Sequence, residues 1–364
     1  MKKSILAIII TITGILIAGC AGPGRTLNQY LYVACEKTGS YGIATFKIHN
    51  SGLLTPVTET LVTLLTEITS MVADHQGNRV YVAHNVASSG ISIQGINFDT
   101  GELFMRPANT IMDIPKSLAI DPSDRYLGCT FNSSSLYNIY KADETLNTIV
   151  NQTADTPCGI AFNPLSSCCY ITKYYLGGLL ILTYDPKDGR VYDTWEAAAT
   201  ISGLNRPVQV VAHPNGRYIY VLNEESTENT ISGFKLIGKP DNIQPLSKVS
   251  TTLSNLLLVI DPAGRFLYAA KLNDRIINAY GISSETGQLT LIKQIYLDPA
   301  SLVKSLAVTP NGRFLYVSDI GRNVISMFEV TSDSKVLTPL GADISTMDLW
   351  SGRPGVMTTA MKLQ

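Results

Sequence analysis

Short runs of alternating apolar and polar residues, separated by turn residues, fill this chain from one end to the other. The stretch 305–330 shows the pattern most clearly, with the runs SLAVT, RFLYVS and NVISMFEV. Within RFLYVS, Phe314 and Leu315 fall on opposite faces, as successive residues of a pleated strand do. Asn311-Gly312 separates the first two runs, and Asn-Gly is a strong hairpin signal because both residues tolerate positive φ. The stretch therefore predicts three antiparallel strands.

The same unit recurs upstream at spacings of 42 to 50 residues. The turn after the first strand of each unit is marked, in chain order, by His75, Pro122, Pro164, Pro214, Pro262 and Pro310. In most units a second turn precedes a fourth strand, at 50–52, 99–101, 188–189 and 285–287. A repeat of this length, made of four short strands, is typical of a β-propeller with one blade per repeat.

The two ends of the chain predict how the ring closes. Residues 30–33 match the second strand of a unit without a first strand before them, whereas 353–364 match a first strand with nothing after it. Pairing the two in one blade leaves the ring without an exposed sheet edge. We therefore expect an all-β fold, a seven-bladed β-propeller of four-stranded antiparallel blades, whose first blade is closed by the C-terminal strand.

The N-terminus carries the features of an export signal. Lys2 and Lys3 precede an apolar run at 5–17 that is too short to span a bilayer. Residues 17–20, IAGC, resemble the lipobox of bacterial lipoproteins, in which the cysteine is lipidated; an ordinary signal peptide is the alternative. The expected parts are a lipoprotein signal peptide at 1–19, a tether at 20–28 and a single propeller domain at 29–364.

Lipidation of Cys20 predicts a protein anchored in the bacterial cell envelope through its N-terminal lipid. Ala21 is not the aspartate that retains enteric lipoproteins in the inner membrane, so the outer membrane or the cell surface is expected. The chain holds 28 basic and 29 acidic residues with no basic cluster, which argues against a nucleic-acid partner.

The cysteines that follow Cys20 are expected to be small buried residues rather than metal ligands. They are Cys35, Cys129, Cys158, Cys168 and Cys169, an odd number in which no pair has C-x-x-C spacing. Cys168 and Cys169 are adjacent in a predicted strand and should face opposite ways, so a bond between them is not expected. Whether any other pair forms a disulfide stays open. No metal or cofactor is expected.

The repeat is similar to that of a known family, the seven-bladed propeller lactonases, which includes 6-phosphogluconolactonases and the fungal carboxymuconate lactonising enzyme. The resemblance extends over residues 27–363 and is strongest in the last three units, for example in HPNGRYIYVLNE at 213–224. It implies the seven-bladed fold, and it implies that Glu224 is the acid of a lactone-hydrolysing site. The repeat is specific for the fold and less specific for the reaction.

In such a ring, the loops that enter the innermost strands and the loops between second and third strands share one face, which we call the mouth. The turns that hold His75 and His213 lie on the opposite face, so these two residues are not expected to act in a site. We expect the mouth to be a polar funnel, although any solvated loop shows such polarity. Side chains expected there include Tyr174, Tyr175 and, as binding residues, His84, Asn85, Lys116, Lys173, Asn223, Lys304, Asp319 and Arg322.

The sequence departs from the family at the positions that would assist Glu224. The family's Pro-Arg-His before the innermost strand of the fifth blade reads PVQ at 207–209, and its Asn-Arg-Gly in the next blade reads KLN at 271–273. Arg206 or Lys271 would have to substitute, so Glu224, Arg206 and Lys271 are the catalytic candidates. No other catalytic motif is present.

Two functions follow from these observations. The favoured hypothesis is an exported, lipid-anchored propeller of the cell envelope that binds or scaffolds, with an eroded lactonase site. Its partner at the mouth would be a small molecule, a glycan or a protein. The alternative is a hydrolase of a lactone or related ester that uses Glu224. The sequence leaves open whether any catalysis remains.

Overall fold

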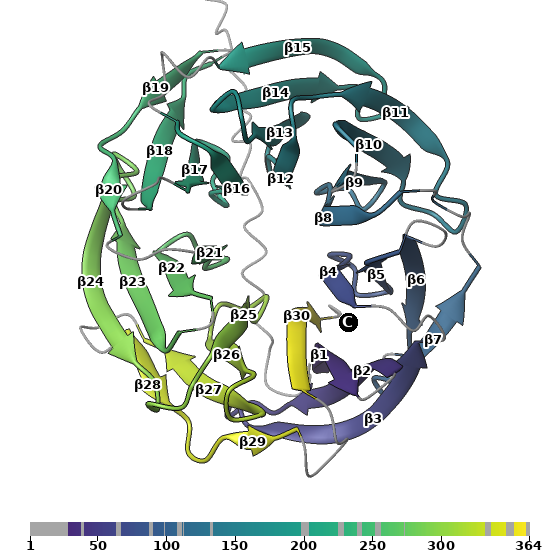
Figure 1. Cartoon of the computed structure of the whole chain (residues 1–364), viewed down its shortest axis with the longest axis vertical. Coiled ribbons are helices and arrows are strands. Elements are labelled where there is room, and N and C mark those ends of the chain that lie inside the picture. The colour runs from purple at the N-terminus through teal and green to yellow at the C-terminus, as the bar shows by residue number, and fades with distance from the viewer. Residues whose placement is uncertain are drawn as a thin grey trace, which may run out of the picture.

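The computed structural model describes residues 28–37, 40–62, 67–86, 90–97, 99–107, 111, 113–131, 134–197, 204–224, 229–238, 242–251, 256–272, 274–331, 336–346 and 353–361. The predicted signal peptide and Cys20 lie outside the described residues. Within these residues, thirty strands form seven antiparallel sheets that stand as blades around a ring (Figure 1). The described residues form no helix, and so none that could cross a membrane.

Each blade runs from an innermost to an outermost strand, and the blades are numbered one to seven along the ring. The innermost strands are β30 (Arg353–Met361), β4 (Ile68–Ala73), β8 (Pro115–Ile120), β12 (Pro157–Phe162), β16 (Pro207–Ala212), β21 (Leu256–Ile260) and β25 (Val303–Val308). The second strands are β1 (Gln29–Lys37), β5 (Arg79–His84), β9 (Tyr126–Phe131), β13 (Cys168–Lys173), β17 (Tyr218–Asn223), β22 (Phe266–Lys271) and β26 (Phe314–Asp319). The third strands are β2 (Ser40–Ile48), β6 (Ile91–Ile96), β10 (Leu136–Lys141), β14 (Gly178–Tyr184), β18 (Thr230–Leu236), β23 (Ile276–Ile282) and β27 (Val324–Val330).

The outermost strands differ from blade to blade. They are β3 (Leu54–Val62), β7 (Leu103–Arg106), β11 (Thr148–Thr153), β15 (Val191–Ala197), β19 (Ile243–Pro245) with β20 (Val249–Ser250), β24 (Leu289–Tyr296), and β28 (Leu337–Pro339) with β29 (Ile344–Ser345). Blades five and seven thus have two short outer strands where one was expected. In both, a proline ends the first piece, Pro245 or Pro339, because proline has no N–H to continue the ladder.

The predicted closure between the chain ends is confirmed. Strand β30 pairs antiparallel with β1, from Gln29 opposite Met361 to Glu36 opposite Arg353, and it forms the innermost strand of blade one (Figure 1). The yellow C-terminal strand therefore lies beside the purple N-terminal one. Since this pairing replaces a free sheet edge, it joins the first and last parts of the chain in one ladder.

Tyrosines of the second strands join several neighbouring blades. Four buried hydroxyls donate to backbone carbonyls near the outer turn of the following blade: Tyr32 to Gly101 (3.3 Å), Tyr81 to Ala142 (2.6 Å), Tyr220 to Gly287 (2.8 Å) and Tyr316 to Gly52 (2.9 Å). Gly287 has φ of 74°, and a Cβ there would lie 2.4 Å from the ring of Tyr218. Both the backbone angle and the close ring require glycine at this turn.

The hydrophobic core consists of layers between neighbouring blades. Cys168 packs with Val210 and Ile219 of blade five, whereas Cys169 packs with Tyr137 of blade three, so the two face opposite ways as expected. All five cysteines of the described part are buried and free of disulfides.

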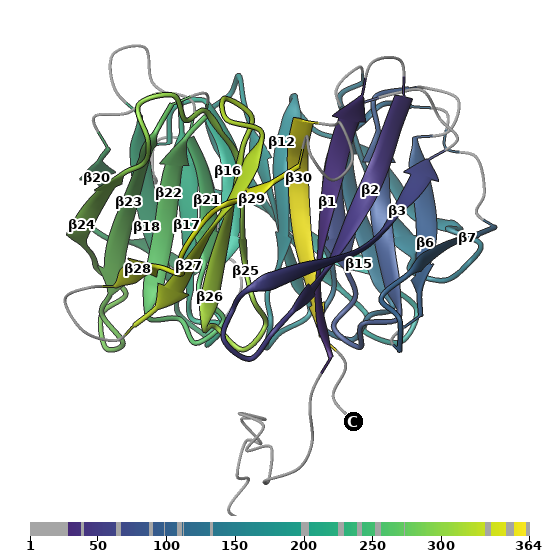
Figure 2. The same cartoon turned by 90° about the horizontal axis from the view of Figure 1, so that it is seen from below.

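Figure 2 shows the ring from the side, with β1 rising toward the mouth from the face that carries the turns. His213 lies in one of those turns, where it is 5% exposed. Its Nδ1 accepts from the N–H of Asn215 at 3.1 Å, and its Nε2 lies 2.9 Å from the carbonyl oxygen of Gly264. His213 therefore holds two turns together on the face opposite the mouth.

Candidate functional site

Three polar side chains from blades four and five meet at the mouth. The hydroxyl of Tyr174 donates to Oε2 of Glu224 at 2.9 Å, and Nη2 of Arg206 donates to the same hydroxyl. The guanidinium of Arg206 also lies over the ring of Tyr174, 4.7 Å from its centroid. We call this set the Tyr174 cluster. It contains two of the three catalytic candidates and the tyrosine that joins them.

The backbone fixes two members of the cluster against each other. The N–H of Glu224 donates to the carbonyl of Arg206 at 3.0 Å, just beyond the last strand pair of β16 and β17. Arg206 has φ of 49°, an uncommon angle for a residue with a Cβ. Backbone strain of this kind concentrates at functional sites when the surrounding structure enforces it.

Blade four presents its tyrosine by an equivalent connection. The N–H of Tyr174 donates to the carbonyl of Thr156 at 3.2 Å, directly after β13, and Thr156 also has a positive φ of 41°. The ring of Tyr175 packs edge-on against that of Tyr174, with centroids 5.2 Å apart. The loop that ends β13 therefore directs one tyrosine toward blade five, while Tyr175 is 73% exposed.

Electrostatics keep the Tyr174 phenol protonated. Partial burial and the hydrogen bond to Glu224 raise the pKa of Tyr174, and the charge of Arg206 opposes this only in part. A protonated phenol donates to the carboxylate and accepts from the guanidinium at the same time. Tyr174 is thus a neutral link between an anion and a cation that do not pair directly.

The cluster has the groups that ester or lactone cleavage requires. Within the described residues, the second carboxylate oxygen of Glu224 has no hydrogen-bond partner, so it can accept a proton from water. Arg206 is exposed and offers further N–H donors to a developing oxyanion. A base and an oxyanion donor on one cluster are compatible with hydrolysis, and equally with binding a hydroxylated ligand.

Asn223 lies beside Glu224 but points into the protein. It is fully buried, and its Nδ2 donates to the hydroxyls of Ser232 at 2.9 Å and Thr230 at 3.2 Å. Its Oδ1 accepts from the N–H of Asn205 at 3.4 Å. The residue thereby ties the loop that precedes β16 to the end of β17, which supports the position of Glu224.

The predicted residues of blade six and blade seven lie at the mouth but are held by acids. Nζ of Lys271 lies 2.7 Å from Oδ2 of Asp274, within its own loop, and the structure does not bring it into the Tyr174 cluster. Nη1 of Arg322 donates to Asp343 at 2.5 Å, and its Nε lies 4.0 Å from Asp298. Both cations are therefore already partnered.

Asp319 has a structural position. It is fully buried, and its Oδ1 accepts from three backbone N–H groups, those of Leu302 at 2.8 Å, Gly321 at 3.0 Å and Arg322 at 3.2 Å. These bonds connect the entry of β25 to the loop after β26. Within the described residues, its Oδ2 has no hydrogen-bond partner.

Blade two places its two predicted residues differently. His84 is fully buried, with Nε2 2.8 Å from the Ser92 hydroxyl, and burial lowers its pKa to about 4. A neutral buried imidazole of this kind is not directed at solvent. Asn85 is exposed and donates to Glu67 at 3.5 Å.

The two lysines at the strand entries occupy β-bulges. The pairing register shifts at Pro115–Ser117 and at Val303–Ser305, so Lys116 and Lys304 are the extra residues of two bulges. A bulge changes the direction in which a side chain points. Nζ of Lys116 lies 3.0 Å from Sγ of Cys158, and Nζ of Lys304 lies 3.7 Å from Glu67.

Lys173, the last of the predicted binding residues, is 6% exposed at the end of β13, and it too makes polar contacts. Cys20 lies outside the described residues. No group of three or more histidine, cysteine or acidic side chains that could hold a metal occurs within the described ranges. That any of these residues binds a ligand stays a prediction.

Sequence reasoning placed Tyr174 at the mouth but did not give it a role. The available signal was its position, since it follows β13 as Glu224 follows β17 in the next blade. What the sequence could not show is that the phenol reaches across the blade boundary to both Glu224 and Arg206.

Known proteins resemble this chain in sequence and in fold. Residues 155–305 match the family model described as Lactonase, 7-bladed beta-propeller. A 6-phosphogluconolactonase of Yersinia pestis (strain Pestoides F) is 23% identical over 280 residues, which are 73% of this chain and 81% of that protein. The same values hold for a 6-phosphogluconolactonase of Yersinia pseudotuberculosis serotype O:3 (strain YPIII).

Solved structures share the fold at lower identity. A Bacteroides uniformis ATCC 8492 protein superposes with a TM-score of 0.75 at 17% identity, over 92% of this chain and 100% of that one. The periplasmic gluconolactonase of Pseudomonas aeruginosa superposes with a TM-score of 0.73 at 14% identity, over 92% and 99%. The resemblance expected from the repeat is thereby confirmed, and the chain is similar to the seven-bladed β-propeller lactonase family.

Proposed function

We propose that this protein hydrolyses a lactone, with Glu224 as the general base. The observation that carries the proposal is the Tyr174 cluster, in which one hydroxyl contacts both Glu224 and Arg206. On sequence alone a binding role without chemistry was favoured, because the family's arginines are missing near Glu224. Arg206 now supplies a cation from a neighbouring position, which favours the hydrolase.

The proposed reaction uses the three residues in distinct roles. Glu224 takes a proton from water as the water oxygen bonds to the lactone carbonyl carbon, and Arg206 stabilises the oxyanion of the tetrahedral intermediate. When the intermediate collapses, the bond from carbon to the ring oxygen breaks, and Glu224 returns the proton to that oxygen. The product is an open hydroxy acid. Tyr174 orients the carboxylate throughout.

We further propose that the substrate carries no phosphate. Three cations of the mouth, Lys271, Lys304 and Arg322, each have a carboxylate neighbour at 2.5 to 3.7 Å. A phosphate bound by these three would have to compete with those carboxylates. The relatives named 6-phosphogluconolactonase act, by that name, on a phosphorylated compound, whereas the Pseudomonas protein is named a gluconolactonase.

The location proposed for this activity is the cell envelope. The lipobox-like residues 17–20 support lipidation of Cys20. Strand β1 begins at Gln29 on the face that carries the turns (Figure 2), whereas Glu224 follows the mouth end of β17. An anchor attached a few residues before β1 would therefore leave the mouth pointing away from the membrane. Labelled palmitate in the wild type but not in Cys20→Ser is the expected result, and equal labelling would contradict it.

The activity is tested with a panel of lactones, comprising glucono-1,5-lactone, its 6-phosphate, γ-butyrolactone and an N-acyl homoserine lactone. We expect the wild type to hydrolyse an unphosphorylated member faster than the 6-phosphate. If it binds a lactone without turning it over, the binding role favoured by the sequence holds instead. If the 6-phosphate is the best substrate, the hydrolase stands but the assigned substrate class is wrong.

A further inference from the structure

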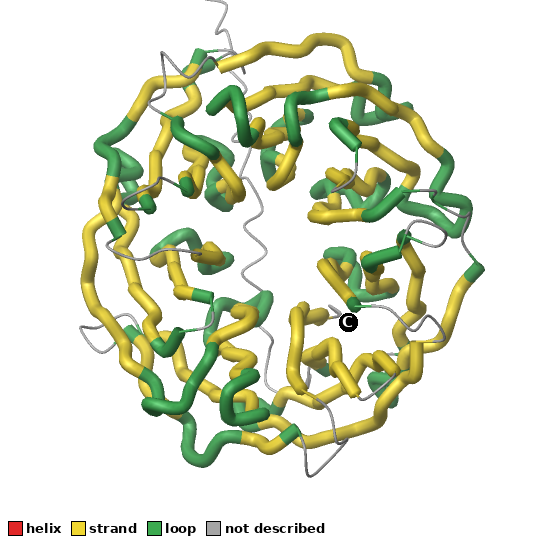
Figure 3. Tube along the Cα trace, in the orientation of Figure 1, coloured by secondary structure: helices red, strands yellow, loops and turns green. Residues whose placement is uncertain are grey.

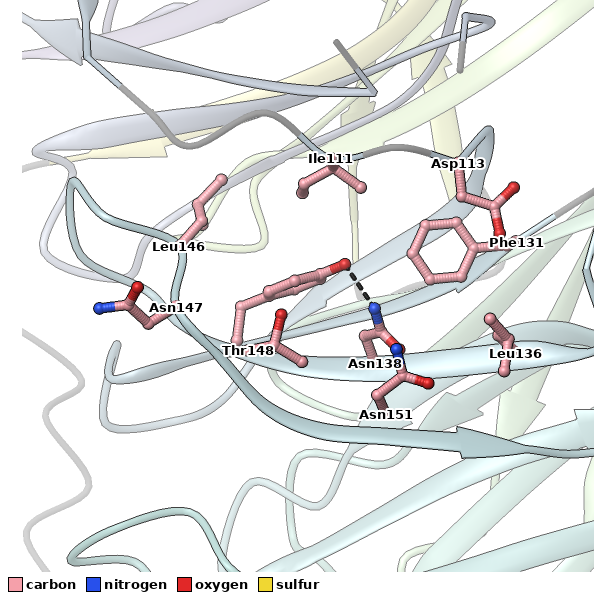
Figure 4. Close-up of a pocket in the computed structure, with 10 residues that line it drawn as sticks. Ile111, Asp113, Phe131, Leu136, Asn138, Leu146, Asn147, Thr148 and Asn151 are labelled. Carbon is pink, nitrogen blue, oxygen red and sulfur yellow. Dashed lines mark hydrogen bonds between the residues drawn. The ribbon is translucent and has the colours of Figure 1, made fainter. Parts of the chain in front are cut away.

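A pocket along blade three lies away from the Tyr174 cluster, although Asp113, Phe131 and Leu136 of its lining are on the mouth side of the ring. It has a volume of about 620 Å³, which is within the range of ligand sites. Figure 4 shows its lining, which consists of Ile111, Asp113, Phe131, Leu136, Asn138, Tyr140, Leu146, Asn147, Thr148 and Asn151. Nearly all of these residues belong to blade three, two blades away from Glu224.

The pocket lies where blade three faces blade two. Leu136, Asn138 and Tyr140 line it from β10, and Tyr140 also joins a cluster with Tyr81 and Ile93 of blade two. Residues of β11 complete this wall.

One buried polar atom in this wall has no partner. Asn138 is 7% exposed, and its Nδ2 donates to the hydroxyl of Tyr140 at 2.7 Å. Its Oδ1 has no hydrogen-bond partner within the described residues. An unsatisfied buried amide oxygen costs free energy, so such an atom in a native protein requires an explanation.

Blade six contains the same motif with the oxygen satisfied. Asn278 and Tyr280 occupy the same positions in the third strand, and Nδ2 of Asn278 likewise donates to the Tyr280 hydroxyl, at 3.3 Å. Oδ1 of Asn278 accepts from Nε2 of Gln294 at 2.9 Å. Gln294 lies directly opposite Asn278 on the outermost strand β24.

In blade three the residue opposite Asn138 is Asn151, which is one methylene shorter than glutamine. Asn151 also lines the pocket and is exposed. The difference between the two blades is therefore a shortened side chain and a freed carbonyl oxygen, both at the pocket wall.

The lining determines what kind of ligand fits. It contains no cation, and the carboxylate of its one acid, Asp113, accepts from the Ile114 N–H at 2.7 Å and from the Ser134 hydroxyl. Anions are therefore disfavoured. The Tyr140 hydroxyl can donate and Asn138 Oδ1 can accept, but that oxygen has almost no accessible surface, so a ligand hydroxyl would meet both only by displacing the exposed side chain of Asn151 opposite it. Phe131 and Leu136 add apolar surface.

We propose that this pocket binds a neutral saccharide. Amide and hydroxyl groups of the outer wall, Asn147, Thr148 and Asn151, would bind further sugar hydroxyls, and the apolar side chains would pack against the ring C–H groups. The site is independent of the Tyr174 cluster and does not rest on lactone hydrolysis.

The test measures binding of maltose, cellobiose and di-N-acetylchitobiose to the full-length protein by calorimetry and saturation-transfer NMR, with glucose 6-phosphate as the anionic probe. We expect saturable binding of at least one neutral disaccharide and none of the phosphate. No binding of any neutral probe, which would mean that the pocket holds water only, overturns the proposal. So does equal or tighter binding of glucose 6-phosphate.

Two matched substitutions locate the binding. Asn151→Gln should satisfy the Asn138 oxygen as Gln294 does in blade six, and should weaken binding about tenfold or more. The reverse change in blade six, Gln294→Asn, should leave the affinity unchanged. Because Asn151 is exposed, the Asn151→Gln variant should fold. Unchanged binding in Asn151→Gln, or loss of binding in Glu224→Gln, would place the sugar elsewhere and overturn the proposal.

Discussion

The two sides of the mouth use charged residues in different ways. On the side of blades four and five, Arg206 contacts a phenol, and Glu224 receives one hydrogen bond from the same phenol. On the side of blades six and seven, Lys271 and Arg322 pair directly with carboxylates at 2.7 and 2.5 Å. Direct pairing neutralises a charge in place. A neutral link leaves both charges available for a substrate.

The cause of this difference is local. Lys271 and Asp274 are three residues apart in one loop, and Arg322 reaches Asp343 of its own blade. Arg206 and Glu224 flank the same end of the β16–β17 pair, one before β16 and the other after β17, and the hydroxyl of Tyr174 reaches both from blade four. Position at the mouth is therefore not sufficient for function. The partner of each charge decides what it can do.

Replacing Arg206 should have a large effect. We expect Arg206→Met to lower kcat about 100-fold, because an oxyanion donor is lost. Arg206→Lys should recover part of the loss, since it keeps the charge without the planar donor pair. Steady-state hydrolysis of the best lactone in the panel measures this. Full activity in Arg206→Met would show that Arg206 has no catalytic role, so the cations on the two sides of the mouth would not differ in function.

Removing the hydroxyl of Tyr174 should have a smaller effect. Tyr174→Phe is expected to lower kcat about tenfold, because Glu224 loses the hydrogen bond that orients it. The matched control is Tyr175→Phe, which alters the exposed neighbour of Tyr174 and should leave kcat unchanged. Equal losses in both variants would show that kcat depends on the loop after β13 as a whole, rather than on the hydrogen bond from Tyr174 to Glu224.

On the other side of the mouth, a substitution should affect stability rather than activity. Asp319→Ala removes the acceptor of three backbone N–H groups and should lower the free energy of unfolding by about 2–4 kcal/mol. Asp319→Asn keeps one acceptor oxygen and should cost less. Urea denaturation followed by fluorescence measures both. A folded Asp319→Ala variant with unchanged stability but lost activity would show that Asp319 acts in the reaction rather than in stability.

The smallest effect is expected at Lys271. Lys271→Met breaks a half-exposed ion pair, which contributes little to stability, and should change kcat by less than about twofold. The same lactone assay applies. A 100-fold loss would mean that Lys271, rather than Arg206, supplies the cation that the family pattern lacks.

The fold could be predicted from the sequence because six of the seven blades have a similar turn after the first strand. Seven blades and their closure followed from these turns, from the second turns with glycine, and from the first strand at 353–364, which has no second strand after it. The interrupted outer strands of blades five and seven were missed, although Pro245 and Pro339 mark them. Those outer strands contribute least to the repeat.

The site was accessible only in part. Strand direction placed Glu224, Arg206 and Tyr174 on one face, but it could not say which side chains touch across a blade boundary. The burial of His84 was also hidden, because its ring turns inward to Ser92. Likewise, the unsatisfied oxygen of Asn138 becomes visible only when Asn151 is compared with Gln294 in three dimensions.

The central claim is that Glu224 is the base of a working hydrolase, and one measurement tests it most directly. It compares kcat/KM of wild type and Glu224→Gln for glucono-1,5-lactone, with Glu36→Gln as control because Glu36 is an exposed acid at the end of β1, across the mouth. We expect Glu224→Gln to lose at least about 100-fold and Glu36→Gln to retain full activity. Equal rates for wild type and Glu224→Gln would contradict the claim.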